Sequence, residues 1–113
     1  MLAENWDSAD SVVSVGEIHT ESPFVAKIIT PGGLLAPLLP PTGGHRRQDT
    51  PRAYFPYGVA YLTKVAAFRT TPTFYQTRTL PFFIERWQNF EIDDAVDFSC
   101  VETILRERTE RRI

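Results

Sequence analysis

An acidic cluster near the C-terminal end of the chain has the most recognisable chemistry. The run Glu91-Ile92-Asp93-Asp94 is followed one helical turn later by Asp97. In an extended segment, residues two apart point to the same face, so Glu91 and Asp93 are predicted to present two carboxylates together at a strand end. Carboxylate oxygens, with substrate phosphates completing the shell, are the ligands that Mg²⁺ uses at phosphate-transfer sites. The spacing therefore predicts a magnesium site on Glu91 and Asp93.

The same cluster also has a purely structural interpretation. Asp94 is placed to cap the N-terminus of a following helix, and Asp97 lies three residues later, near the capping-box position. Glu91 would then simply be solvated. The two interpretations are compatible, because Asp94 can cap the helix while Glu91 and Asp93 bind a cation.

A basic run in the middle of the chain is the second polar feature, His45-Arg46-Arg47-Gln48-Asp49. The planar guanidinium group of arginine matches carboxylates and phosphates, so a pair of loop arginines can hold an anionic substrate. The alternative is a solvated basic loop, and both interpretations stay open on spacing alone. His19 and His45 show no metal-ligand spacing.

Short strands and one helix are predicted to position these groups. β-branched and aromatic residues bounded by Pro and Gly predict strands over residues 10–18, 24–30, 59–62 and 79–84, with a short strand at 90–92. Pro81 indicates that its strand lies at a sheet edge. Several strands followed by a helix indicate an α/β fold.

The predicted helix covers residues 95–108, where four apolar residues recur at helical spacing. They are Phe98, Val101, Ile104 and Leu105. Carboxylates begin the helix and arginines end it, so both ends complement the helix dipole. Cys100 lies between positions that are expected to face the core, which predicts a buried, inert thiol.

Residues 31–53 form a long segment that prolines and glycines make irregular. Its four leucines argue against simple disorder, and an apolar segment of this kind is expected to pack either on its own core or on another subunit. They are Leu34, Leu35, Leu38 and Leu39.

Composition narrows the function classes. The chain has 113 residues, of which 42% are hydrophobic and 23% are charged, and its net charge of -2 provides no field that would recruit nucleic acid. No apolar run approaches the roughly 20 residues of a membrane-spanning helix. The single cysteine excludes an internal disulfide framework and is compatible with a reducing compartment. We therefore expect a cytoplasmic protein with neither nucleic acid nor a membrane as a partner.

Four motifs, taken in order, resemble the acylneuraminate cytidylyltransferases, the family of CMP-sialic acid synthetases. The motifs are residues 9–15 (ADSVVSV), residues 47–49 (RQD) with Pro51 and Tyr54, residues 56–61 (PYGVAY), and residues 90–94 (FEIDD) with Asp97 and Phe98. Each motif alone is weak, but their order and approximate spacing match the family over most of the chain. The resemblance implies the C-terminal part of a Rossmann-like nucleotidyltransferase sheet, with a dimerisation extension and a C-terminal helix.

The resemblance also implies a reaction. Such enzymes transfer CMP from CTP to the anomeric oxygen of a nonulosonic acid and release pyrophosphate, while Mg²⁺ neutralises the phosphates. The family's paired metal ligands fall on Glu91 and Asp93, and its substrate-contacting Arg-Gln pair falls on Arg47 and Gln48. Its dimerisation element falls on residues 34–56, which implies a homodimer and accounts for the leucines there.

Two departures from the family shape the expectation. Tyr57 stands where the family usually has Asn, so a sugar contact by that Asn has no counterpart here. The basic, glycine-containing loop that cradles CTP in the family also has no counterpart in these residues, which resemble only the C-terminal half. We therefore expect no transferase activity from the 113-residue chain alone. The alternatives are a non-catalytic dimerisation or sugar-acid-binding module, and a small α/β domain with no ligand.

Overall fold

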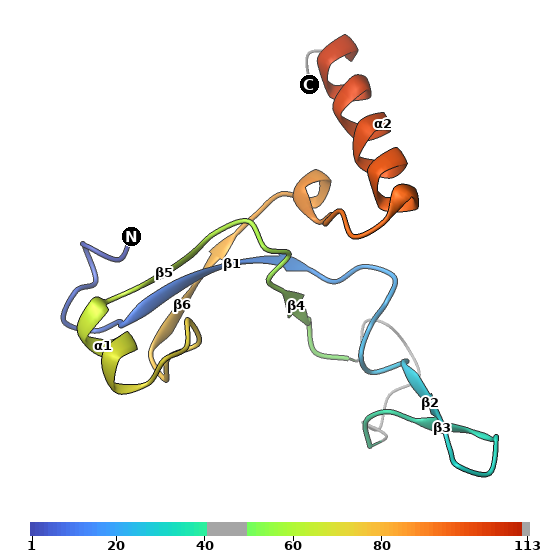
Figure 1. The fold of residues 1–113 in the computed structure, drawn as a ribbon, viewed down its shortest axis with the longest axis horizontal. Helices are drawn as coiled ribbons and strands as arrows, with labels where there is room; N and C mark the ends of the chain where they lie inside the picture. Colours follow the sequence, from blue (N-terminus) through green and yellow to red (C-terminus); the bar gives the residue numbers. More distant parts are fainter. Residues whose placement is uncertain (41–49, 112–113) are drawn as a thin grey trace. The chain divides into compact units, whose positions relative to one another are not determined.

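The computed structural model describes residues 1–40 and 50–111 (Figure 1). The chain divides into two compact units, one formed by Met1–Gly16 with Pro56–Ile113 and the other by Glu17–Phe55. The first unit combines strands with a long C-terminal helix, so the predicted mixed α/β class is confirmed at that level. Within the described residues, no helix has both the length and the apolar character needed to cross a membrane.

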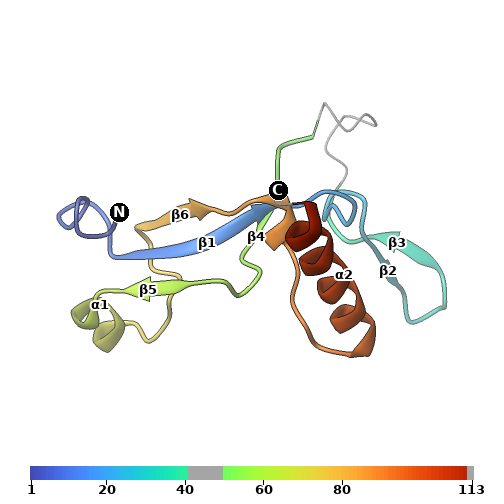
Figure 2. The same ribbon diagram turned by 90° about the horizontal axis from the view of Figure 1, so that it is seen from above.

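The first unit is built on β1 (Ser11–Glu17), which lies between β5 (Tyr61–Thr63) and β6 (Thr79–Phe83), as Figures 1 and 2 show. β5 pairs with β1 in the antiparallel sense and β6 pairs with it in the parallel sense. The strands predicted over 10–18 and 79–84 are therefore confirmed. Pro81 lies in β6, which pairs only with β1 in the described part of the chain, as predicted for an edge strand.

Small side chains form the buried centre of this sheet. The buried hydrophobic side chains are Ala9, Val12 and Val13, and the serines Ser11 and Ser14 are buried among them. The Ser11 and Thr79 hydroxyls lie 2.6 Å apart in a hydrogen bond that links β1 to β6. A buried hydroxyl is tolerated when it has such a partner. The buried centre of β1 thus combines valines with serines that have hydrogen-bond partners.

Gly16 ends the buried part of β1 because Asn89 lies against it. A Cβ atom at position 16 would be 1.9 Å from Oδ1 of Asn89, far inside contact distance. Asn89 is itself buried, so its side chain has little room to move away. Only glycine permits this approach between β1 and the segment that follows β6.

Asp10 anchors the other end of β1 to both neighbouring strands. Its carboxylate accepts hydrogen bonds from Nη2 and Nε of Arg78 at 2.8 and 2.9 Å, and the Lys64 ammonium lies 3.5 Å away. The hydrogen bonds from Arg78, followed by the positive charges of Arg78 and Lys64, lower the pKa of Asp10 against an opposing effect of burial. Because Lys64 follows β5 and Arg78 precedes β6, one carboxylate holds the three strands in register.

The connection from β5 to β6 contains α1 (Val65–Thr70), which the sequence did not predict. A 3-10 helix, η2 (Arg86–Gln88), follows β6. The strand predicted at 90–92 is wrong, because this segment satisfies its backbone locally. The Phe90 amide donates to the Gln88 carbonyl at 2.8 Å, and the Asp93 amide donates to Oδ2 of Asp97 at 3.0 Å.

The C-terminal helix α2 (Ala95–Arg111) confirms the helix predicted over 95–108 and continues one turn beyond it. Its cap also follows the prediction, because the Asp97 amide donates to Oδ1 of Asp94 at 2.9 Å. The guanidinium of Arg108 lies 3.7 Å from the ring centre of Trp87 in η2. No residue of α2 is buried, and Cys100 is exposed, so the predicted burial of that thiol is wrong. The helical spacing was right, and of the predicted apolar face Val101 and Ile104 are half-buried whereas Phe98 and Leu105 are exposed.

The second unit contains a hairpin of β2 (Lys27–Ile29) and β3 (Leu35–Pro37), together with β4 (Tyr54–Phe55). β2 confirms the strand predicted at 24–30 over three residues, whereas β3 lies in the segment predicted to be irregular. The leucines predicted to pack on their own core or on another subunit are all exposed. Leu35, for example, is 75% exposed, so the hairpin presents apolar side chains to solvent.

Candidate functional site

Ser14 joins two of the motifs that carry the family resemblance. Its hydroxyl accepts a hydrogen bond from the Ala60 amide at 2.9 Å and donates to the Pro56 carbonyl at 3.2 Å. The Ser14 amide also donates to the Ala60 carbonyl at 2.9 Å. The Ser14 hydroxyl and the Ser14 backbone amide therefore connect the PYGVAY motif to the centre of β1 by hydrogen bonds.

The turn within this motif has an unusual backbone. Tyr57 and Gly58 have φ angles of 47° and 65°, both in the left-handed region. Glycine adopts this region freely, and among other residues Asn does so more readily than Tyr. The Asn that the resembling family usually has at this position would therefore suit the backbone that the structure gives to Tyr57.

Glu91 lies directly against this turn. A Cβ atom added to Gly58 would be 2.9 Å from Oε1 of Glu91, so the glycine leaves space for the carboxylate. The negative charge of Glu91 also contributes to raising the pKa of Tyr75. The third and fourth motifs, about thirty residues apart in the sequence, therefore meet at the Glu91 side chain.

An aromatic cluster borders the carboxylate, formed by Tyr61, Phe68, Phe74 and Tyr75. The Tyr61 ring lies 5.7 Å from the Phe74 ring and 6.2 Å from the Tyr75 ring, between centres. Phe68 in α1 lies 5.7 Å from Phe74. Burial, and then a hydrogen bond with Tyr61, are the main causes that raise the pKa of Tyr75. The site therefore combines an aromatic wall with one acidic group.

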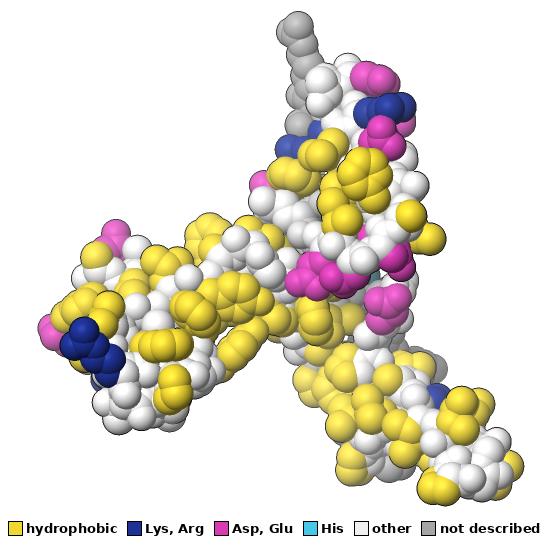
Figure 3. Space-filling model, in the orientation of Figure 1, with side chains coloured by type: hydrophobic (Ala, Val, Ile, Leu, Met, Phe, Trp, Pro, Cys, Tyr) yellow, Lys and Arg dark blue, Asp and Glu magenta, His cyan; other side chains and the backbone are white. Residues whose placement is uncertain are grey.

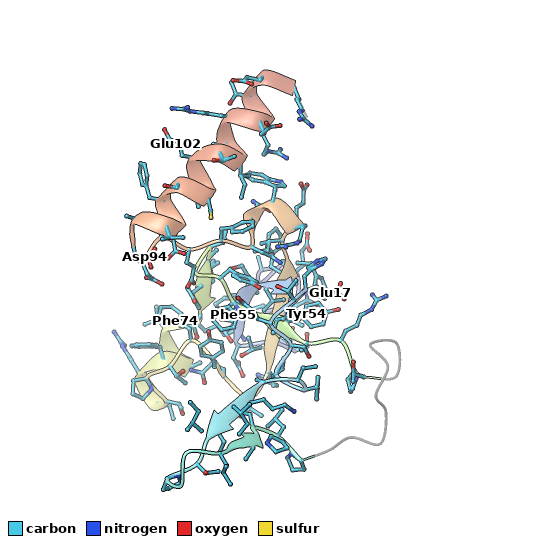
Figure 4. The ribbon with its side chains drawn as sticks, turned by 90° about the vertical axis from the view of Figure 1, so that its right-hand side faces the viewer. Glu17, Tyr54, Phe55, Phe74, Asp94 and Glu102 are labelled. Carbon is cyan, nitrogen blue, oxygen red and sulfur yellow. The ribbon has the colours of Figure 1, made fainter. Side chains whose placement is uncertain are left out.

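The sequence prediction of the site missed Phe74 and Tyr75. Figure 4 labels Phe74 in the segment after α1, where the sequence had suggested no element. Adjacent aromatic residues in a segment otherwise rich in threonine were the only available signal. That signal does not reveal their position beside Tyr61, because the contact depends on the turn made by α1.

The remaining acidic residues gather at the start of α2, where Figure 3 shows a group of acidic side chains and Figure 4 labels Asp94. Asp94 and Asp97 are used in the helix cap. Glu91 and Asp93 are exposed, and among the described residues neither forms an ion pair with Lys or Arg. Both carboxylates thus keep the oxygen-ligand chemistry that a magnesium ion requires.

The predicted metal site on Glu91 and Asp93 and the predicted substrate site on Arg47 and Gln48 both remain predictions. Residues 1–40 and 50–111 contain no group of three or more His, Cys, Asp or Glu side chains arranged to hold a metal ion. The convergence of Glu91 and Asp93 on one cation therefore stays a prediction. Arg47 and Gln48, predicted to bind the substrate, lie outside the described residues, as do His45 and Arg46.

No family model and no curated protein sequence matches this chain. The resemblance to the cytidylyltransferases consequently rests on the four sequence motifs.

Proposed function

We propose that the chain forms the part of a cytidylyltransferase that binds the sugar acid and the metal ion. Such an enzyme transfers CMP from CTP to a nonulosonic acid and releases pyrophosphate. The observation that carries this proposal is the position of Glu91 against Gly58. It brings the acidic motif of residues 90–94 to the turn of residues 56–61. This contact is expected if the two motifs belong to one site.

The sheet supports the same proposal. The first motif forms β1, and Ser14 within it holds the turn of the third motif through three hydrogen bonds. β1 and β6 are parallel, the sense in which the strands of a nucleotide-binding sheet pair, although β5 pairs with β1 in the antiparallel sense. A Rossmann-like arrangement is accordingly part of the proposal.

Glu91 and Asp93 would be the protein ligands of a magnesium ion, an assignment that rests on the chemistry of their carboxylates, because the strand expected to align them is absent. Mg²⁺, when bound, would supply charge neutralisation for the phosphates of the nucleotide. The chain's own residues would orient the second substrate. The aromatic wall of Tyr61, Phe74 and Tyr75 would contact the apolar side of the sugar acid, as aromatic side chains commonly do in ligand pockets. Arg47 and Gln48 would bind its carboxylate.

The direct test is binding of the reaction product, which carries both a phosphate and the sugar acid. Saturation-transfer NMR of the purified chain with CMP-N-acetylneuraminic acid should show contact that depends on added Mg²⁺. Glu91→Gln and Asp93→Asn should each abolish the Mg²⁺ dependence. Glu110→Gln, which removes an exposed carboxylate from α2, serves as the matched control and should leave it intact. Binding that is equal with and without Mg²⁺, or equal in all variants, would overturn the metal assignment.

A non-catalytic dimerisation or sugar-acid-binding module is the second candidate. The exposed leucines of the β2–β3 hairpin favour this candidate, because an exposed apolar surface suits a protein interface whether or not the chain catalyses a reaction. This candidate predicts that free N-acetylneuraminic acid binds without Mg²⁺ and that the CMP group adds nothing to the affinity. The same NMR experiment with the free sugar acid distinguishes the two functions.

A further inference from the structure

Tyr57 has a backbone conformation that a bulky residue rarely adopts. Its φ angle is 47°, and among the described residues it alone, apart from glycines, has a positive φ angle. A side chain in this region is strained because its Cβ atom crowds the following carbonyl oxygen. Strain of this kind persists only where the surrounding structure imposes it, and it is found most often at ligand sites.

The surrounding structure imposes the turn through Ser14. The Ser14 hydroxyl donates to the Pro56 carbonyl at 3.2 Å, before Tyr57, and accepts a hydrogen bond from the Ala60 amide at 2.9 Å, after it. The Ser14 amide also donates to the Ala60 carbonyl at 2.9 Å. Because Ser14 is buried in β1, both ends of the segment 57–59 are fixed to the sheet. We therefore expect the turn to keep its conformation when residue 57 is changed.

The same turn brings Tyr57 close to the Glu91 carboxylate. Gly58, the next residue, has a φ angle of 65°, and a Cβ atom added to it would be 2.9 Å from Oε1 of Glu91. Consecutive Cα atoms lie about 3.8 Å apart, which is less than the length of a tyrosine side chain. The Tyr57 ring therefore has the length to contact a ligand that is bound at Glu91.

An aromatic ring at position 57 also matches the other side chains near this carboxylate. The charge of Glu91 acts on Tyr75, whose ring lies 6.2 Å from that of Tyr61, between centres. Phe74 lies 5.7 Å from Tyr61 in the same way. Aromatic rings around one polar group are typical of sites that bind a ligand with both an apolar side and hydroxyl groups.

We propose that Tyr57 is a specificity-determining residue, whose ring contacts the apolar side of the ligand bound at Glu91. The inference rests on the proposed function, because it takes the sugar acid as that ligand. It adds that the backbone strain at position 57 accompanies a contact that only an aromatic side chain can make. Asparagine would adopt the backbone more readily but would lose this contact.

Three substitutions separate the ring from the strain. Tyr57→Phe keeps both, Tyr57→Ala keeps the strain without the ring, and Tyr57→Asn removes the ring and suits the backbone. The probe is CMP-N-acetylneuraminic acid, and its dissociation constant is measured by calorimetry with and without Mg²⁺. Tyr57→Phe should weaken binding by at most about threefold, whereas Tyr57→Ala and Tyr57→Asn should each weaken it by about tenfold or more.

The ratio of the constants with and without Mg²⁺ should stay native in all three variants, because the ring is not a metal ligand. Phe24→Ala, which removes a half-buried ring from the other unit, is the matched control and should bind as the native chain does. Far-UV circular dichroism checks that each variant is folded.

Thermal unfolding tests the strain without any ligand. Tyr57→Asn and Tyr57→Ala both lack the ring, so the difference between them reports how readily each residue adopts a positive φ angle. Tyr57→Asn should unfold a few degrees above Tyr57→Ala. Equal midpoints would mean that position 57 is not strained, and they would overturn the inference.

The binding results can also overturn it. Native affinity in Tyr57→Asn or Tyr57→Ala would show that the ring makes no contact, and a loss in Tyr57→Phe as large as in Tyr57→Ala would exclude a contact through the ring. A changed Mg²⁺ ratio in Tyr57→Ala would mean that Tyr57 acts by positioning Glu91 instead. If the native chain did not bind the probe, the proposed function would fail together with this inference. Native binding that the substitutions leave unchanged would overturn this inference alone.

Discussion

Gly58 is subject to two separate constraints, its left-handed backbone and the carboxylate of Glu91 beside it. Gly58→Ala should destabilise the fold by about 1–2 kcal/mol, because an L-residue in this backbone region is strained. The new methyl group should also displace the Glu91 carboxylate and weaken any Mg²⁺-dependent binding. Urea unfolding gives the first quantity and a Mg²⁺ titration gives the second.

Gly32→Ala is the natural control for this substitution. Gly32 has no positive φ angle, and an added Cβ atom would meet only the Thr30 hydroxyl at 3.8 Å. Its substitution should leave both stability and Mg²⁺-dependent binding close to native. If both variants lost equal stability and equal Mg²⁺-dependent binding, the effect at Gly58 would not be caused by its left-handed backbone or by the nearby Glu91.

Asp10 predicts a specific dependence of stability on pH. Hydrogen bonds from Arg78 hold the pKa of this carboxyl below its ordinary value in the folded state. The resulting stabilisation is fully present above the pKa of the unfolded chain, about 3.9, and is lost as the pH falls through the lower folded pKa. The thermal midpoint of the native protein should therefore fall more steeply below about pH 4 than that of Asp10→Asn. Parallel profiles for the two proteins would contradict the role given to Asp10.

At the scale of elements, α2 depends on its acidic cap. Asp94→Ala removes the side chain that accepts a hydrogen bond from the Asp97 amide. The substitution should lower the stability of the helix by about 0.5–2 kcal/mol. Glu110→Ala, an exposed change near the opposite end of the helix, should stay within about 0.5 kcal/mol. Far-UV circular dichroism during urea unfolding measures both. A larger cost at Glu110 than at Asp94 would argue against the cap.

The elements that sequence analysis predicted correctly are those with strong local signals. β1 and β6 are rich in β-branched or aromatic residues, and α2 has helical spacing with a capping aspartate. β3 was missed because its three residues become a strand only through pairing with β2. The strand predicted at 90–92 failed for the opposite reason, since its β-forming residues found local hydrogen bonds instead of a neighbouring strand.

The candidate site shows the same division between local and long-range information. The acidic motif marks Glu91 in the sequence, and the turn motif marks Gly58. Their contact, and the position of Phe74 and Tyr75 beside them, depend on how β1, α1 and β5 bring distant segments together. A sequence can thus indicate a candidate residue such as Glu91, whereas the residues that surround it are found only from the fold.

At the scale of the molecule, the exposed hairpin predicts association. Leu34, Leu35 and Leu38 are each at least half exposed, and apolar patches of this kind mark interfaces. Leu35→Asp should therefore reduce homodimerisation through residues 34–56, measured by sedimentation over a range of concentrations. Thr30→Asp, at the turn of the same hairpin, controls for added charge. Unchanged dimerisation in the leucine variant would locate the contact elsewhere.

The last prediction concerns catalysis by the 113-residue chain alone, for which we expect no measurable CMP transfer. Phosphoryl-type transfer depends on positioning and on charge stabilisation around the phosphates. Glu91 and Asp93 would supply the metal ligands, but the loop with which the resembled family cradles the triphosphate is expected to have no counterpart in these residues. The assay combines purified chain, CTP, Mg²⁺ and a panel of nonulosonic acids, with pyrophosphate as the readout. Sugar-dependent release above that of a Glu91→Gln, Asp93→Asn double variant would mean that other residues of this chain hold the nucleotide. We expect the chain to bind the product without catalysing transfer. It would hold the sugar acid and the metal ion, but it would not hold the triphosphate of CTP in position for the reaction.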